Sequence, residues 1–142
     1  MPLFVVLAFL LLTASQALAE WVEVNFLSKR GMTTHIDLQT IRLHGNLSQL
    51  WTLDDFREAQ QSRWSAPYRS AKALQEFDCA ERQSRIVLMT RYAENMGMGE
   101  VVLNADEPDK DWITIPSGSI TNLLFKMACG GTRRLTGFSP SH

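Results

Sequence analysis

The hydrophobic period of the chain changes once, and this change constrains the fold more than any other feature. Between residues 20 and 115, apolar and polar residues alternate in short stretches, a period of two that is typical of half-buried strands. After Pro116 the apolar residues follow helical spacing, from Ile120 and Leu123 to Ala128. An isolated helix of about twelve residues is marginal in water. Its apolar stripe therefore has to pack on the sheet.

The helix also carries start and stop signals. Ser117 or Ser119 can cap its first amides, and Gly130-Gly131 is a natural stop. The period-two stretches before it predict an antiparallel sheet of about six strands, so the expected fold is α+β, with the amphipathic helix on one face of the sheet. The predicted strands are residues 20–27, 33–38, 40–44, 47–53, 75–92, 100–103 and 112–115, the long one with a bulge.

Turns and connections separate these strands. Residues 28–31, His44-Gly45-Asn46-Leu47 and residues 95–99 have the composition of turns, and residues 106–111 form an acidic loop. Residues 54–74 show no apolar period. We therefore expect an exposed connection there, with a helical turn at residues 54–60.

The first nineteen residues are typical of a secretory signal peptide. Residues 3–12 are an unbroken apolar run, and Ala17-Leu18-Ala19 forms a cleavage site before Glu20. Ten residues of helix rise about 15 Å, half of a hydrocarbon core of about 30 Å, so no permanent membrane span is expected. No cysteine precedes Cys79 that could carry a lipid. We expect a signal peptide (1–19), one domain (20–129) and a flexible tail (130–142), in a protein exported to the periplasm or beyond without a lipid anchor.

Export decides how the two cysteines are interpreted. In an oxidising compartment, Cys79 and Cys129 are expected to pair, the alternative being two buried free thiols. The bond would close a loop of 50 residues (129 minus 79). Such a loop corresponds to about 4 kcal/mol of stabilisation through the unfolded state. The disulfide would fasten the end of the helix to the sheet.

Charge is close to balanced overall but unevenly distributed. The net charge of -1 argues against nucleic acid as a partner. Residues 56–92 hold seven Lys or Arg against four acids, whereas residues 94–112 hold six acids against one Lys. An ordinary solvated surface has both signs, but an arginine-rich side can also dock a protein or a polyanion. The possible partner-binding residues are Arg57, Arg63, Trp64, Tyr68, Arg69 and Lys72.

Two other tryptophans, Trp51 and Trp112, lie within alternating strands, and we assign them to the core. His35 and Asp37 share one face of a strand, with His44 one hairpin away. No fourth ligand is suitably spaced, so we expect no metal and no cofactor.

No catalytic motif stands out. Ser117-Gly118-Ser119 lacks the Gly-flanked nucleophile of a serine hydrolase, and capping explains its serines. Carboxylate pairs for hydrolysis could be drawn from Asp54, Asp55, Asp78 and Glu81, but without specificity. We expect a non-enzymatic binding protein. The alternatives are a small periplasmic hydrolase and a self-associating envelope component that dimerises through a sheet edge.

Several short motifs follow one another in a recognisable order. They are Trp51-Thr52-Leu53-Asp54-Asp55-Phe56, Ser70-Ala71-Lys72, Phe77-Asp78-Cys79, Arg85, Tyr92, Met96-Gly97-Met98-Gly99-Glu100-Val101-Val102, Trp112, Ile115-Pro116-Ser117-Gly118-Ser119 and Cys129. This ordered set resembles the surface-adhesin protein E-like family of bacterial secreted proteins, from Glu20 to Cys129. The resemblance implies an antiparallel sheet with a C-terminal helix tied to it by a disulfide. The family takes its name from a lipid-anchored adhesin that binds host extracellular proteins, whereas this chain has no cysteine at the expected mature N-terminus.

Overall fold

The described residues form an antiparallel sheet and an α-helix. The computed structural model describes residues 20–24, 31–106 and 108–136, with the backbone alone from residue 131 onwards. The predicted signal peptide (1–19), residues 25–30 of the predicted first strand and turn, Glu107 and the last six residues of the predicted tail lie outside this part. The described strands are β1 (Val22–Val24), β2 (Met32–His44), β3 (Leu47–Gln60), β4 (Tyr68–Asp78), β5 (Gln83–Tyr92), β6 (Val101–Asp106) and β7 (Ile113–Thr114).

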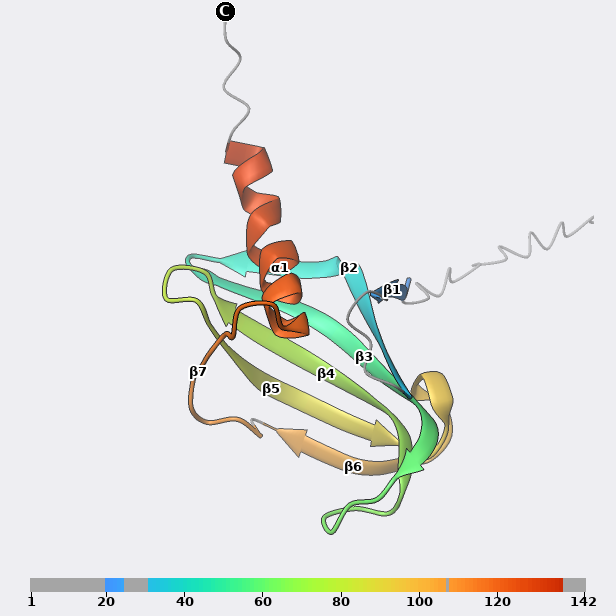
Figure 1. The fold of residues 1–142 in the computed structure, drawn as a ribbon. Coiled ribbons are helices and arrows are strands. Elements are labelled where there is room, and N and C mark those ends of the chain that lie inside the picture. Colours follow the sequence, from blue (N-terminus) through green and yellow to red (C-terminus); the bar gives the residue numbers. More distant parts are fainter. Residues whose placement is uncertain (1–19, 25–30, 107, 137–142) are drawn as a thin grey trace, which may run out of the picture.

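Neighbours in the chain are also neighbours in the sheet, in the order β1 to β6, and the short β7 pairs with β5 (Figure 1). A 3-10 helix, η1 (Asn95–Gly97), connects β5 to β6, and α1 (Ile120–Thr136) follows β7. The α+β architecture, the antiparallel pairing and the C-terminal helix predicted from the sequence are therefore confirmed.

The middle of the chain differs from its prediction. Residues 54–74 are not an exposed connection, because β3 continues to Gln60 and β4 begins at Tyr68. Polar residues of β3 and β4 bind the segment around η1 directly. Ser70 Oγ donates to the Glu94 carbonyl at 2.6 Å, and Asp55 Oδ1 accepts from the Met96 amide at 2.7 Å. These contacts replace the apolar alternation that normally marks a strand.

The predicted strand 75–92 is two strands, β4 and β5, joined by a tight turn. Asp78 Oδ1 accepts hydrogen bonds from the amides of Ala80 and Glu81, and Arg82 has a left-handed backbone with φ of 55°. The turn contains neither glycine nor proline, so the composition of this segment does not indicate a turn. Cys79 consequently lies in the turn after β4 rather than at the start of a strand.

A bulge merges two other predicted strands into one. Residues 33–38 and 40–44 both belong to β2, whose pairing with β3 shifts between Asp37 and Arg42. The hairpin turn after them is confirmed, with Gly45 at a φ of 60° that favours glycine.

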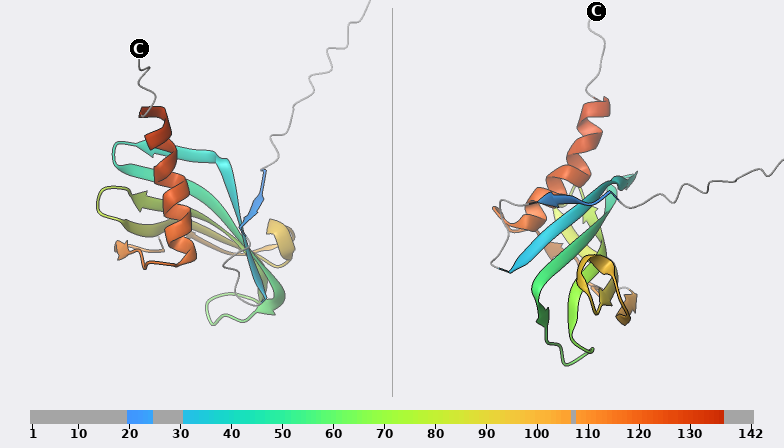
Figure 2. Two further views of the ribbon diagram at one scale, coloured as in Figure 1. Left: turned by 45° about the horizontal axis from the view of Figure 1, so that its top comes forward. Right: turned by 90° about the vertical axis from the view of Figure 1, so that its right-hand side faces the viewer.

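The core lies between α1 and one face of the sheet (Figure 2). Leu124, Phe125 and Ala128 of α1 are buried there. The remaining buried members of this cluster are Val24, Ile36, Leu50, Phe77 and Ile115. Ser48 Oγ of β3 donates to the Ala128 carbonyl at 2.8 Å, which attaches the helix backbone to the sheet.

Both ends of the packed part of α1 are fixed. Ser119 Oγ accepts from the Asn122 amide at 3.1 Å, so Ser119 is the N-terminal cap that the sequence predicted. Cys79 and Cys129 form the expected disulfide, with Cα atoms 5.7 Å apart. The helical backbone continues past Gly130-Gly131 to Thr136, into residues that the sequence assigned to the tail.

Introducing a charge into this core tests the packing. Leu124→Asp places an unpaired carboxylate where the side chain is 1% exposed. We expect the free energy of unfolding to fall by about 3 kcal/mol or more, because cavity and charge burial add. The control Leu43→Asp, at a side chain 45% exposed, should cost far less. Equal melting temperatures for the two variants would contradict the packing of α1 on the sheet.

Candidate functional site

The sheet face opposite α1 carries the candidate site. Along β3, Ser48, Leu50 and Thr52 are buried on the α1 side. Because side chains alternate, Trp51 points to the opposite face. Val22 of β1 pairs with Ile36 of β2, so Trp21, one residue before Val22, lies beside Asp37 of β2. On the other edge of β2, Asp37 pairs with Trp51 of β3.

The assignment of Trp51 and Trp112 to the core is wrong, because both side chains are only partly buried. Trp112 stacks against Arg85, whose guanidinium carbon lies 4.6 Å from the ring centroid. Alternation places a tryptophan on one face of a strand but does not show which face a helix covers.

The bulge in β2 builds one wall of the site. The Thr40 hydroxyl accepts from the Trp51 amide at 3.1 Å and donates to the Asp37 carbonyl at 2.6 Å, so it replaces a backbone partner that the bulge removes. Asp37 Oδ1 accepts from the Gln39 amide at 3.0 Å. Two side chains of the bulge are therefore held in place by hydrogen bonds to the backbone.

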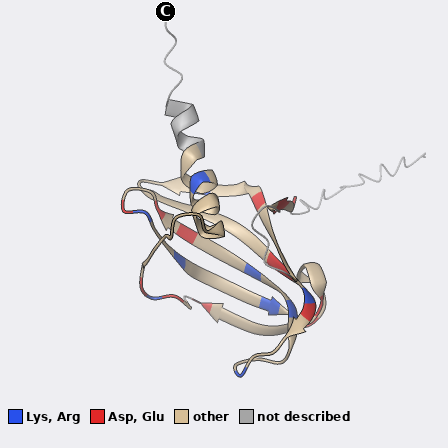
Figure 3. Cartoon of the chain, in the orientation of Figure 1, with Lys and Arg blue, Asp and Glu red and all other residues tan. Residues whose placement is uncertain are grey.

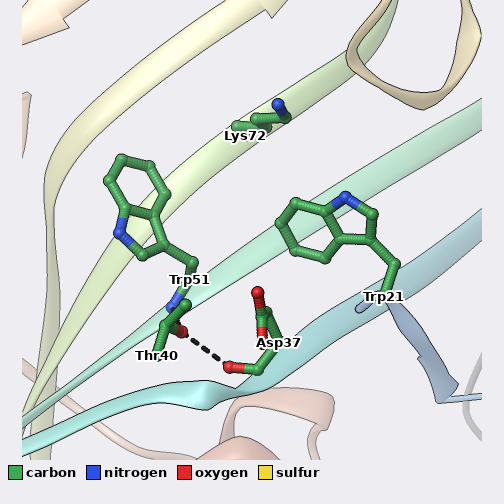
Figure 4. Close-up of a pocket in the computed structure, with 5 residues that line it drawn as sticks. All are labelled: Trp21, Asp37, Thr40, Trp51 and Lys72. Atoms are coloured by element: carbon green, nitrogen blue, oxygen red, sulfur yellow. Dashed lines mark hydrogen bonds between the residues drawn. The ribbon is translucent and has the colours of Figure 1, made fainter. Parts of the chain in front are cut away.

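A cavity of about 290 Å³ lies over this face, lined by Trp21, Asp37, Thr40, Trp51 and Lys72. Figure 4 shows the two indoles on either side of it, with Asp37 and Thr40 on the β2 side and Lys72 on β4. Asp37 is 5% exposed, so its carboxyl group meets solvent mainly through the cavity.

Aromatic rings and η1 position Lys72. Its Nζ lies 5.9 Å from the ring centroid of Trp21 and 5.3 Å from that of Tyr92, within the range of cation–π attraction. Gly97 lies so close that a Cβ added there would be 2.6 Å from Lys72 Cε, and its φ of 70° also favours glycine. The Gly97 amide donates to Ser70 Oγ at 2.9 Å, which anchors η1 beside the lysine.

The predicted partner-binding residues do not form one cluster. Lys72 lines the cavity, whereas the others belong to the β3–β4 hairpin, whose loop (61–67) projects from the end of the sheet away from α1 (Figure 1). In this loop, which we call the hairpin tip, Trp64 is 78% exposed and Arg63 is exposed as well. Arg57 is exposed on the neighbouring part of β3. Arg69 Nη1 donates to the Arg57 carbonyl at 3.0 Å.

The base of the hairpin is braced by a ring stack. The Arg91 guanidinium lies 4.5 Å from the Tyr68 ring centroid and donates to Ser62 Oγ at 3.0 Å. Phe56 meets Tyr68 edge to face, with centroids 5.7 Å apart. Tyr68 is partly buried within this stack and supports the hairpin tip.

The histidines and carboxylates considered for catalysis or metal binding are not gathered. No group of three or more His, Cys, Asp or Glu in the described part of the chain could hold a metal ion. His44 lies at the far end of β2 from His35, beyond the bulge. Asp78 caps the β4–β5 turn, where Glu81 donates its amide to it, and neighbouring Asp54 and Asp55 point to opposite faces of β3.

Asp54 lies on the α1 face and accepts a hydrogen bond from Thr34 Oγ1 at 2.7 Å. Burial raises the pKa of its carboxyl group above 3.8, and the Thr34 hydrogen bond and the charge of His35 oppose this rise in part.

Among the described helices, none is long and apolar enough to cross a membrane.

Comparison with known proteins identifies one family. Residues 21–130 match the model of the family described as surface-adhesin protein E. A selenomethionine form of Haemophilus influenzae protein E superposes with a TM-score of 0.55 at 13% identity, covering 78% of this chain and 85% of that one. Protein E from non-typeable Haemophilus influenzae gives 0.54 at 14% identity, covering 79% and 78%. No curated protein sequence matches the chain.

The raised pKa of Asp54 predicts a pH dependence of stability. The folded state binds the Asp54 proton more tightly than the unfolded state does. The free energy of unfolding therefore falls as the pH rises from about 3.8 to the pKa of Asp54 in the folded state. Above that pKa, the contribution of Asp54 to stability no longer changes with pH. Asp54→Asn removes the titrating group and keeps an acceptor for Thr34. In urea unfolding at a series of pH values, the variant should gain stability relative to the wild type as the pH rises through this window. A relative loss would contradict the burial effect.

Proposed function

The chain belongs to the surface-adhesin protein E family, and on this basis we propose that it is an exported, non-enzymatic binding protein that docks a protein partner through the hairpin tip. The single observation that carries the proposal is Trp64, a large aromatic side chain that is 78% exposed at a projecting loop. Tryptophan and arginine are the residues most enriched among those that dominate binding energy at protein interfaces.

The charge of the hairpin tip supports an acidic partner. The ion pair found among the described residues is Arg85–Glu76, on the sheet rather than on the hairpin. Among the described residues, no ion pair is found for Arg57, Arg63 or Arg69, and Glu58 is the neighbouring acid in β3. Figure 3 shows basic residues at the hairpin tip and along β4 and β5. Such a surface accelerates association with an acidic partner.

The bracing of the hairpin tip also supports a binding role. The Arg91 stack on Tyr68 and the Arg69 hydrogen bond to the Arg57 carbonyl fix the two arms of the hairpin. A loop that is ordered before binding loses less conformational entropy on association. The exposed Trp64 is thus presented from a supported base.

Export is part of the proposal. Residues 1–19 have the composition of a signal peptide, and the disulfide belongs to an oxidising compartment. The mature chain then begins at Glu20 and acts in the periplasm or outside the cell. The mass of the protein recovered from the periplasmic and extracellular fractions tests both the start of the mature chain and its location.

Substitutions at the hairpin tip test the binding surface. Mature wild-type protein and the variants Trp64→Ala and Arg63→Ala are passed over immobilised extracellular-matrix extract and over envelope extract. Removing an exposed aromatic anchor should weaken capture about tenfold or more. Capture should also fall as salt rises, since exposed charges are screened. The matched control is Met98→Ala, an apolar side chain that is 62% exposed and lies outside the loop 61–67.

Two results would contradict this proposal. One is a specific partner captured equally well by the wild type and by Trp64→Ala. The other is capture that Met98→Ala reduces as strongly as Trp64→Ala does.

A further inference from the structure

We propose that the cavity between Trp21 and Trp51 binds a ring of a neutral saccharide, at a site separate from the hairpin tip. The cavity is on the sheet face opposite α1, and its volume of about 290 Å³ is at the lower end of the range for small-molecule sites. It therefore fits a small ring and not a large cofactor.

The walls of the cavity select a ligand with a flat apolar face. The indoles of Trp21, which precedes β1, and Trp51 of β3 lie on either side of it (Figure 4). The face of an indole is electron-rich and packs against polarised C–H groups as well as against other rings. A pyranose ring offers such C–H groups on its face and hydroxyl groups around its rim.

The polar groups of the cavity select a ligand that both donates and accepts hydrogen bonds. The Thr40 hydroxyl already donates to the Asp37 carbonyl and accepts from the Trp51 amide, so it is committed to the bulge. Asp37 and Lys72 remain as the charged groups of the lining. An ionised carboxylate only accepts and an ammonium only donates, and a ring of hydroxyl groups satisfies both.

The charges of the cavity favour a neutral ligand. One carboxylate and one ammonium cancel, whereas an anion would face Asp37 and a cation would face Lys72. Each charge is also partly satisfied within the fold. Lys72 Nζ lies against the rings of Trp21 and Tyr92, and Asp37 Oδ1 accepts from the Gln39 amide. A saccharide binds these two groups through its hydroxyl groups and forms no ion pair with them. A zwitterion would instead have to pair with both charges, so the lining favours the saccharide.

The site is ordered before any ligand arrives. Asp37 and Thr40 are fixed by the hydrogen bonds of the β2 bulge, and Gly97 of η1 lies against the Lys72 side chain. Preorganised polar groups lose little entropy on binding. Asp37, Thr40, Lys72 and Gly97 do not belong to the hydrophobic core cluster under α1.

The experiment uses neutral oligosaccharides as probes for the mature, oxidised protein. A panel of glucose, galactose, mannose and N-acetylglucosamine trisaccharides is titrated to millimolar concentration, and the indole N–H signals are followed by NMR. We expect at least one trisaccharide to shift the Trp21 and Trp51 signals saturably and to leave the Trp64 signal unchanged. This measurement needs no variant. A panel in which no trisaccharide shifts the two signals would overturn the proposal.

Variants then locate the site. Asp37→Asn keeps the shape and an acceptor for the Gln39 amide, and it should weaken binding about tenfold or more, as expected for the loss of charged hydrogen bonding. The matched control is Asp109→Asn, since Asp109 Oδ2 likewise accepts a backbone amide, that of Ile86 at 3.0 Å, away from the cavity. Trp21→Ala should also weaken binding about tenfold, because one stacking wall is lost.

Trp64→Ala should leave saccharide binding unchanged, which distinguishes this site from the hairpin tip. Unchanged affinity in both Asp37→Asn and Trp21→Ala would contradict the assignment. So would displacement of the saccharide by choline or by free L-tryptophan at comparable concentration, because the cavity would then be selecting a cation or a zwitterion.

Discussion

The packing of α1 across the sheet is the interaction on which the rest of the structure depends. Leu124, Phe125 and Ala128 cover one face of the meander, and the Ser48 hydroxyl and the Cys79–Cys129 disulfide attach the same stretch of helix at two further points. Closing a loop of 50 residues contributes about 4 kcal/mol by restricting the unfolded state. For a domain of this size that is a large fraction of the total stability.

Because α1 occupies one face, the surfaces left for the binding that we propose are the other face and the loops. A regular β2 would leave the far face as an even pleated surface. The bulge between Asp37 and Arg42 interrupts this even surface. Within the bulge, the Thr40 hydroxyl accepts the hydrogen bond of the Trp51 amide and so keeps this amide paired. The hairpin tip is an independent feature, since its supports are Tyr68 and Arg91 rather than the core. The two surfaces can therefore be tested separately by substitution.

The sequence predicted what depends on local pattern and on compartment: the helix, a cap at Ser117 or Ser119, the turn at Gly45 and the disulfide. It failed where a contact distant in sequence replaces an apolar residue, as at Asp55 and Ser70, which bind η1 from positions that lack an alternating pattern. The cavity was not predicted. Alternation does not show which face is covered, so it places Trp51 in the core, and proximity in sequence groups Lys72 with the hairpin arginines. Pairing β1 with β2 and β2 with β3 is what brings Trp21, Asp37 and Trp51 together.

Amide hydrogen exchange along α1 tests most directly whether helix and sheet form one cooperative unit. The account predicts that the amides of Leu124, Phe125 and Ala128 are protected to the same free energy as those of Leu50 and Thr52 in the oxidised protein, because opening the helix exposes the core of the sheet. Rapid exchange along the helix while β3 stays protected would contradict it, since the helix would then open without loss of the sheet.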